Sequence, residues 1–116
     1  MERIYLDTDC ILALIKDKDW LKDHVIQRLE SEKDLSTSII TILECKLVIA
    51  REIGREMILD VGDSIDDLGV GIIPLNKEIE TISNELLKEY PFLGIFDSIH
   101  AATCIRDGRT NDTRIA

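Results

Sequence analysis

The sequence YLDTDCILALI, residues 5–15, places two aspartates between two apolar segments. The segment Ile4–Leu6 predicts a buried strand, and the residues after Asp7 predict a turn into a helix that Thr8 or Asp9 can cap. Like-charged carboxylates at the tip of a hydrophobic strand repel one another, so this pair needs a compensating positive charge.

The rest of the chain alternates between patterns typical of strands and of helices. Further strands are predicted at 35–38, 70–75 and 113–116, and further helices at 20–32, 39–53, 56–68, 77–90 and 96–107. Asn76 is placed to cap the helix at 77–90. The alternation predicts an α/β fold, a three-layer sandwich whose parallel sheet of about four to five strands is flanked by helices. Active sites in such sheets lie beyond the carboxyl ends of the strands, where Asp7 is expected.

Composition and charge narrow the class of protein. The chain has 116 residues, 45% of them hydrophobic, which predicts a single domain over residues 1–116. A net charge of −9 argues against a basic nucleic-acid-binding surface. It leaves open an enzyme that meets phosphates through metal ions, because bound cations invert the local charge.

Cysteine usage and hydropathy predict the compartment. Cys10, Cys45 and Cys104 lie far apart in the sequence, so neither a disulfide framework nor a zinc motif is indicated. Reduced thiols in a cytoplasmic protein are therefore expected. No signal peptide is recognisable, and no apolar segment approaches the ~18 residues of a membrane span, so no membrane association is expected.

Three acidic residues stand in unusually apolar surroundings. Asp7 follows the first strand, Glu44 lies within the apolar stretch 39–49, and Asp97 opens an apolar helix rich in small residues. A carboxylate among apolar residues is costly unless it is paired or binds a metal. Each of the three could instead cap a helix or lie half-exposed, but three at the ends of separate elements favour an oxygen-ligand site for Mg²⁺ or Mn²⁺.

These segments resemble the PIN-domain nucleases, and among them the VapC-like toxin ribonucleases of bacterial and archaeal toxin–antitoxin pairs. IYLDTDCILALI (4–15) resembles the family's first strand, first Asp and first helix, and STSIITILECKLVI (36–49) resembles the second strand and the helix that carries a Glu. GIIPLNKEI (71–79) resembles the third strand and its turn, and FDSIHAATCIRDG (96–108) resembles the helix that supplies the next Asp.

The resemblance implies a metal-dependent endoribonuclease. It implies that Asp7, Glu44 and Asp97 hold Mg²⁺ or Mn²⁺ and act in RNA cleavage, and that Thr8 helps to order the site. Asp9 matches a variable position and is expected to be a helix cap. The resemblance further implies a cognate antitoxin and a homodimer, for which the apolar residues of 12–15 and 47–53 are candidate surfaces.

The chain departs from the family pattern at its end. The family usually carries a further acid just after the next strand, whereas here the strand ends the sequence at Ala116. Asp112 precedes that strand and is expected at the opposite end of the sheet. We therefore expect either a domain truncated at its C-terminus, without the last strand and helix of the family, or a site of only three acids, and we favour truncation.

Other polar residues near Asp97 suggest a different chemistry. Ser98, His100 and Cys104 are hydrolase-type residues, but Ser98 and His100 cannot share a helix face. We expect Ser98 to support the first helical turn or the metal site, and His100 to be partly buried with its hydrogen bonds satisfied.

Two alternatives remain open on the sequence alone. The first is a phosphatase of the haloacid-dehalogenase type, with Asp7 as nucleophile and Asp9 as acid, since YLDTDCI and the segment 61–69 (VGDSIDDLG) resemble motifs of that family. The second is a non-catalytic PIN-like binding domain.

Overall fold

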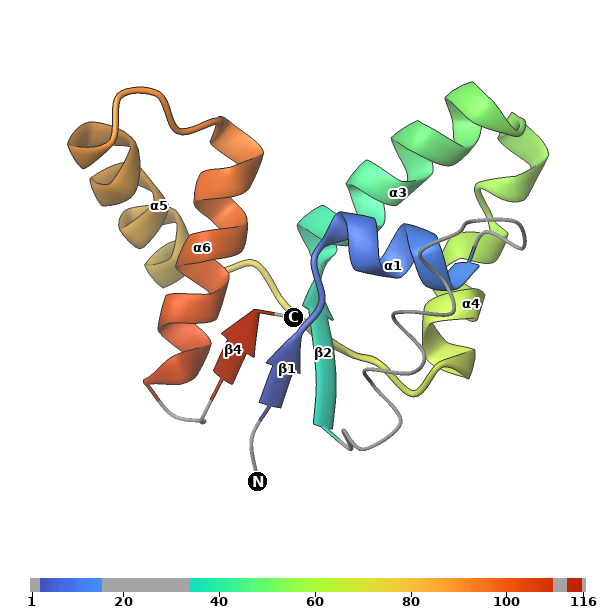
Figure 1. Ribbon diagram of the computed structural model, residues 1–116, viewed down its shortest axis with the longest axis horizontal. Coiled ribbons are helices and arrows are strands. Elements are labelled where there is room, and N and C mark those ends of the chain that lie inside the picture. Colours follow the sequence, from blue (N-terminus) through green and yellow to red (C-terminus); the bar gives the residue numbers. More distant parts are fainter. Residues whose placement is uncertain (1–2, 16–33, 110–112, 116) are drawn as a thin grey trace.

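The computed structural model describes residues 3–15, 34–109 and 113–115 (Figure 1). Its strands are β1 (Arg3–Tyr5), β2 (Asp34–Ser38), β3 (Gly71–Ile73) and β4 (Thr113–Ile115). Its helices are α1 (Thr8–Ile15), α3 (Ile39–Glu52), the short 3-10 helix η1 (Arg55–Met57), α4 (Asp60–Asp67), α5 (Lys77–Glu89) and α6 (Ile95–Gly108). The helix predicted at 20–32 and the placement of Asp112 lie outside the described residues.

The described strands form one parallel sheet in the order β3-β2-β1-β4. β1 lies inside the sheet, with Ile4 opposite Leu35 of β2 on one side and Arg114 of β4 on the other. Figure 1 shows α5 and α6 on one face of the sheet and α1, α3 and α4 on the other. The predicted α/β class and parallel sheet with helices on both faces are confirmed. No helix in the described part of the chain is long and apolar enough to cross a bilayer.

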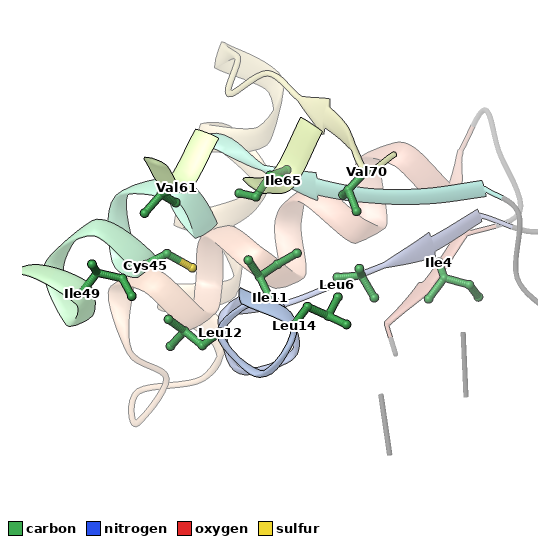
Figure 2. Close-up of a cluster of buried hydrophobic side chains, with 10 residues drawn as sticks. All are labelled: Ile4, Leu6, Ile11, Leu12, Leu14, Cys45, Ile49, Val61, Ile65 and Val70. Atoms are coloured by element: carbon green, nitrogen blue, oxygen red, sulfur yellow. The ribbon is translucent and has the colours of Figure 1, made fainter. Parts of the chain in front are cut away.

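Alternation along the first strand creates two separate cores. Ile4 and Leu6 face α1, α3 and α4, where they join Ile11, Ile65 and other buried apolar side chains of one cluster (Figure 2). Tyr5 points to the other face and packs with α5 and α6 residues in a second cluster. Successive side chains of a strand point to opposite faces, so one short strand anchors both helical layers.

An ion-pair cluster fixes the amino ends of the strands to the last helix. Arg3 Nη1 lies 2.8 Å from Asp107 Oδ1 of α6, and Arg3 Nε lies 3.3 Å from Asp34 Oδ2 of β2. Asp107 is buried and Arg3 is partly buried, so these contacts are less screened than ordinary surface pairs. The cluster joins β1, β2 and α6 at the edge of the sheet opposite to Asp7.

Three local features differ from the sequence prediction. Asp7, and not Thr8 or Asp9, caps α1, because the backbone N–H of Cys10 donates to Asp7 Oδ1 at 3.2 Å. The helix predicted at 56–68 is split into η1 and α4, since among its spaced apolar residues only Val61 and Ile65 reach the core, while Met57 and Leu68 are exposed.

The third difference concerns surface assignment on α1. Leu12 and Leu14 are buried in the first core cluster, so the prediction that 12–15 offers an exposed apolar surface is wrong. Helix α3 ends as predicted before Gly54, whose φ of +153° and ψ of 155° lie in a region that only glycine adopts readily.

The first core should be sensitive to the loss of Ile65, which is fully buried in α4. We expect Ile65→Ala to lower the free energy of unfolding by about 2–5 kcal/mol, because it removes buried methylene groups and leaves a cavity. Urea denaturation followed by circular dichroism measures this change. The matched variant Ile105→Ala, at a position 44% exposed, should cost much less, and equal losses in the two variants would contradict the assigned core.

The predicted cap of α5 is present, because Asn76 Oδ1 accepts a hydrogen bond from the backbone N–H of Ile79 at 2.9 Å. We expect Asn76→Ala to destabilise the protein by about 1 kcal/mol in the same denaturation assay. Asn84→Ala, on the exposed face of the same helix, is the control and should leave stability nearly unchanged.

Candidate active site

A cleft of about 520 Å³ lies at the carboxyl edge of the sheet, between α1, α3 and α6. Asp7, at the end of β1, leads directly into it. The residues that line the cleft are Asp7, Thr8, Asp9, Leu12, Glu44, Leu47, Val48, Arg51, Phe96, Asp97, His100 and Ala101. The three acids singled out from the sequence therefore border one cavity, although they come from three elements far apart in the chain.

Asp7 both caps α1 and borders the cleft. Its Oδ1 accepts the Cys10 N–H at the first turn of α1, which satisfies a backbone donor that the helix itself cannot pair. Its side chain is partly buried and also borders the cleft. The cap therefore fixes where the first carboxylate stands.

Glu44 is held by two hydrogen bonds on the same oxygen. Thr8 Oγ1 donates to Glu44 Oε1 at 2.9 Å, and His100 Nε2 lies 2.5 Å from that oxygen. The Glu44 side chain is 24% exposed, so it is open to the cleft but not freely solvated. Thr8 therefore contacts Glu44 at the edge of the cleft, and its role in ordering the site stays a prediction.

Asp97 and Asp9 are the exposed acids of the cleft. α6 begins at Ile95 with Gly94 at its N-cap position, so Asp97 lies in the first turn and does not cap the helix. Its charge still interacts favourably with the positive end of the helix dipole. Neither of the two carboxylates is packed among core residues, which leaves both free to rotate.

His100 contributes contacts to the cleft that sequence reasoning did not predict. It is only 8% exposed and its hydrogen bonds are satisfied, as predicted, but its partners are Tyr5, Glu44 and, at 3.4 Å, Thr8. The signal was its spacing: His100 follows Asp97 by three residues, so both side chains share one face of α6.

Ser98 takes a structural position. It is fully buried, its Oγ donates to the backbone oxygen of Ile95 at 2.6 Å, and its Oγ lies 2.6 Å from Ser83 Oγ of α5. It does not border the cleft that Asp97 borders. Ser98 therefore supports the first turn of α6 and its contact with α5, the first of the two roles considered for it.

The cleft carries a strongly negative charge. Among the described residues that line the cleft, four are carboxylates, Asp7, Asp9, Glu44 and Asp97, and one is a lysine or arginine, Arg51. Arg51 lies near the end of α3 and is exposed. A polyanion would be repelled from such a cleft unless cations neutralised part of the charge.

The donor set suits a hard divalent cation by its chemistry. All four acids offer oxygen ligands, which Mg²⁺ and Mn²⁺ prefer, and no thiol borders the cleft. As they are placed, no three His, Cys, Asp or Glu side chains among the described residues come close enough together to hold a metal ion. The role of Asp7, Glu44 and Asp97 as metal ligands therefore stays a prediction.

Burial keeps two weakly acidic groups near the cleft, the Tyr5 phenol and the Cys10 thiol, protonated. Desolvation raises the pKa of the Tyr5 phenol, although the hydrogen bond with Ser38 opposes the shift. Desolvation, together with the negative charge of Asp7, raises the pKa of the Cys10 thiol to about 11. Both groups are therefore neutral near pH 7. The three cysteines are free thiols, as predicted.

Comparison with solved structures shows the same fold in several toxins. The Mycobacterium tuberculosis toxin VapC20, described as cleaving the sarcin-ricin loop, superposes with a TM-score of 0.74 at 18% identity, over 90% of this chain and 83% of that one. VapBC of Salmonella typhimurium bound to DNA gives 0.68 at 19% identity, over 93% and 83%. VapBC2 of Rickettsia felis bound to a promoter DNA fragment gives 0.69 at 14% identity, over 98% of both chains.

Sequence comparison supplies the family. No curated protein matches the chain in sequence. The family model of the PIN domain matches residues 4–116, which is nearly the whole chain. Together with the parallel α/β fold and the acid-lined cleft at the carboxyl edge of its sheet, this match shows that the chain belongs to the PIN-domain family.

Proposed function

We propose that this protein is a metal-dependent endoribonuclease and the toxin of a toxin–antitoxin pair. The observation that carries the proposal is the shared cleft of Asp7, Glu44 and Asp97. Membership of a nuclease family supports the reaction class, and the sarcin-ricin-loop-cleaving neighbour supports RNA as the substrate. The three free thiols are consistent with a reducing cytoplasm as its compartment.

Asp7, Glu44 and Asp97 would hold Mg²⁺ or Mn²⁺ at the cleft. The bound ion would activate water for attack on an RNA phosphodiester and neutralise charge on the phosphate. The chain's own contribution is to position the ligands. Asp7 is fixed by its cap bond and Glu44 by Thr8 and His100, whereas Asp97 must rotate toward them from the first turn of α6.

Arg51 is placed to bind the RNA backbone. It is the one lysine or arginine among the described residues of the cleft lining, one turn beyond Leu47 on the same helix, and no ion pair is found for it within that part of the chain. By contrast, Arg106 and Arg109 both contact Glu78 on the outer surface of α5. A guanidinium in the cleft would bind a phosphate beside the metal-bound scissile group.

The antitoxin is proposed to bind an apolar groove next to the cleft. Leu43, Leu47 and Phe96, all at least 46% exposed, line it together with Ala50 and Ile58. The predicted surface at 47–53 thus contributes Leu47 and Ala50. The VapBC neighbours are toxin–antitoxin assemblies, which supports a protein partner, and a homodimer is proposed with it. Solvent-exposed apolar patches of this kind are typical of interaction sites.

The phosphatase alternative finds no support in the fold. Its second motif, 61–69, lies largely within α4, where Val61 and Ile65 pack in the core and Asp63 is exposed on the outside. No residue of that segment borders the cleft with Asp7. The non-catalytic alternative predicts a domain that shows neither metal binding nor RNA cleavage, and the next experiment separates it from the nuclease.

Removing one carboxylate should abolish activity without unfolding the protein. We expect Asp7→Asn and Asp97→Asn each to lower kcat/KM for RNA with Mn²⁺ by roughly a hundredfold or more, about 2.7 kcal/mol of barrier. Asparagine also caps helices, so Asp7→Asn should preserve α1. Cleavage of a fluorescent RNA measures the rates. Asp66→Asn, on the exposed face of α4, is the matched control, and equal activity in all four proteins would refute the proposed site.

Replacing Arg51 should weaken substrate binding more than chemistry. We expect Arg51→Ala to raise KM several-fold, and to reduce the slope of log kcat/KM against log salt concentration by about 0.7, the value for one contact to single-stranded phosphate. Steady-state cleavage at several salt concentrations measures both quantities. Arg106→Ala removes a charge of the same kind outside the cleft, and an identical change in that variant would argue against a specific role for Arg51.

A further inference from the structure

A chain of hydrogen bonds runs from the interior of the second core to the edge of the cleft. Ser38 Oγ lies 2.8 Å from the Tyr5 hydroxyl, which lies 2.7 Å from His100 Nδ1. On the other side of the ring, His100 Nε2 lies 2.5 Å from Glu44 Oε1. The chain therefore links β2, β1 and α6 to the carboxylate that projects from α3.

The direction of each bond follows from what each group can donate. A carboxylate only accepts, so His100 must carry a proton on Nε2 and donate it to Glu44. In the neutral ring Nδ1 is then an acceptor, which the Tyr5 O–H supplies. Burial raises the pKa of that phenol, so it keeps its proton at neutral pH. Its oxygen in turn accepts the Ser38 O–H, and every group in the chain is satisfied.

The two oxygens of the Glu44 carboxylate therefore differ in their hydrogen bonds. The hydrogen bonds from Thr8 and His100 both fall on Oε1, and among the described residues Oε2 has no assigned protein partner. Two donors on one oxygen fix the plane of the carboxylate. Oε2 remains the oxygen that can serve a ligand in the cleft that Glu44 borders.

We propose that Tyr5 and His100 are positioning residues, which lock Glu44 so that only Oε2 is presented to a divalent cation. This inference rests on the proposed function, since it concerns the same cleft. The Tyr5 hydroxyl donates to Nδ1 and so holds the His100 ring in place, and His100 sets the orientation of Glu44. Such outer partners of metal ligands influence affinity because they remove the freedom that the ligand would otherwise lose on binding.

A pair of near-isosteric variants separates positioning from packing. Glutamine places its amide nitrogen near the position of Nε2 and can still donate to Glu44, whereas asparagine reaches only the position of Nδ1. Both are neutral, polar and smaller than histidine at a site that is 8% exposed, so their effects on folding should be similar.

The first readout is binding of Mn²⁺ alone, measured by calorimetry or by the electron paramagnetic resonance of free Mn²⁺. We expect His100→Asn to weaken the affinity by about 10–100-fold, the range found for outer partners of metal ligands, and His100→Gln to restore most of it. Equal affinity in the wild-type protein and both variants would overturn the inference. Equal weakening in both variants would also overturn it, because packing alone would then explain the loss.

The second readout is the tautomer of His100 and the chemical shift of its Nδ1 in the metal-free protein, from long-range ¹H–¹⁵N correlation spectra. We expect the proton on Nε2 in the wild-type protein, and a changed Nδ1 chemical shift in Tyr5→Phe, which keeps the buried ring but loses the hydroxyl that donates to Nδ1. A proton on Nδ1 in the wild-type protein, or an unchanged Nδ1 chemical shift in Tyr5→Phe, would overturn the inference.

These outcomes distinguish the inference from the function on which it rests. If wild-type protein binds Mn²⁺, Asp97→Asn does not, and His100→Asn binds as the wild type does, the metal site stands and the positioning role fails. If the wild-type protein binds no Mn²⁺, the proposed function and the metal-positioning role fail together, and the Nδ1 chemical shift still decides whether Tyr5 holds His100.

Discussion

The parallel pairing of β1 between β2 and β4 is the constraint on which the rest of the structure depends. It fixes the alternation of Ile4, Tyr5 and Leu6, and with it which side chains enter each of the two cores. It also brings Asp7 to the carboxyl edge of the sheet, where α1, α3 and α6 meet. A shift of one residue in this register would exchange the two faces, bury Tyr5 among aliphatic side chains and separate it from His100.

The cleft combines two kinds of carboxylate. Asp7 and Glu44 are tied to protein donors, which makes their positions a property of the fold. Asp97 and Asp9 are exposed and have more freedom to rotate. These four carboxylates repel one another electrostatically. The fold can therefore bring them together only where a cation, or the basic group of a partner, compensates for the repulsion.

The architecture could be predicted from the sequence because hydrophobic periodicity and helix-capping residues are local features of the chain. The alternation of elements, the Asn76 cap and the end of α3 before Gly54 follow from neighbours in the chain. The convergence of Asp7, Glu44 and Asp97 on one cleft was predicted from their apolar surroundings and from the resemblance to the PIN-domain nucleases, and the place of Asp7 from the rule that such sites lie beyond the carboxyl ends of strands.

What sequence reasoning missed depends on distant contacts. Tyr5 and His100 are 95 positions apart, so no local pattern reports their bond, and His100 alone looks like an ordinary buried histidine. Similarly, the burial of Leu12 and Leu14 depends on the packing of α3 and α4 over α1, and the break before α4 depends on which apolar residues find a core.

The ion pairs of Arg3 and the hydrogen bond between Tyr5 and His100 attach α6 to β1 at two points along the helix. Asp107, near the end of the helix, is anchored at the amino edge of the sheet, and His100 is anchored about two turns away toward the cleft. A helix attached at two separated points cannot pivot away from its sheet as a hinged flap would. Opening and closing of the cleft would then depend on side-chain rotations at its mouth, on the timescale of rotamer exchange and not of domain motion.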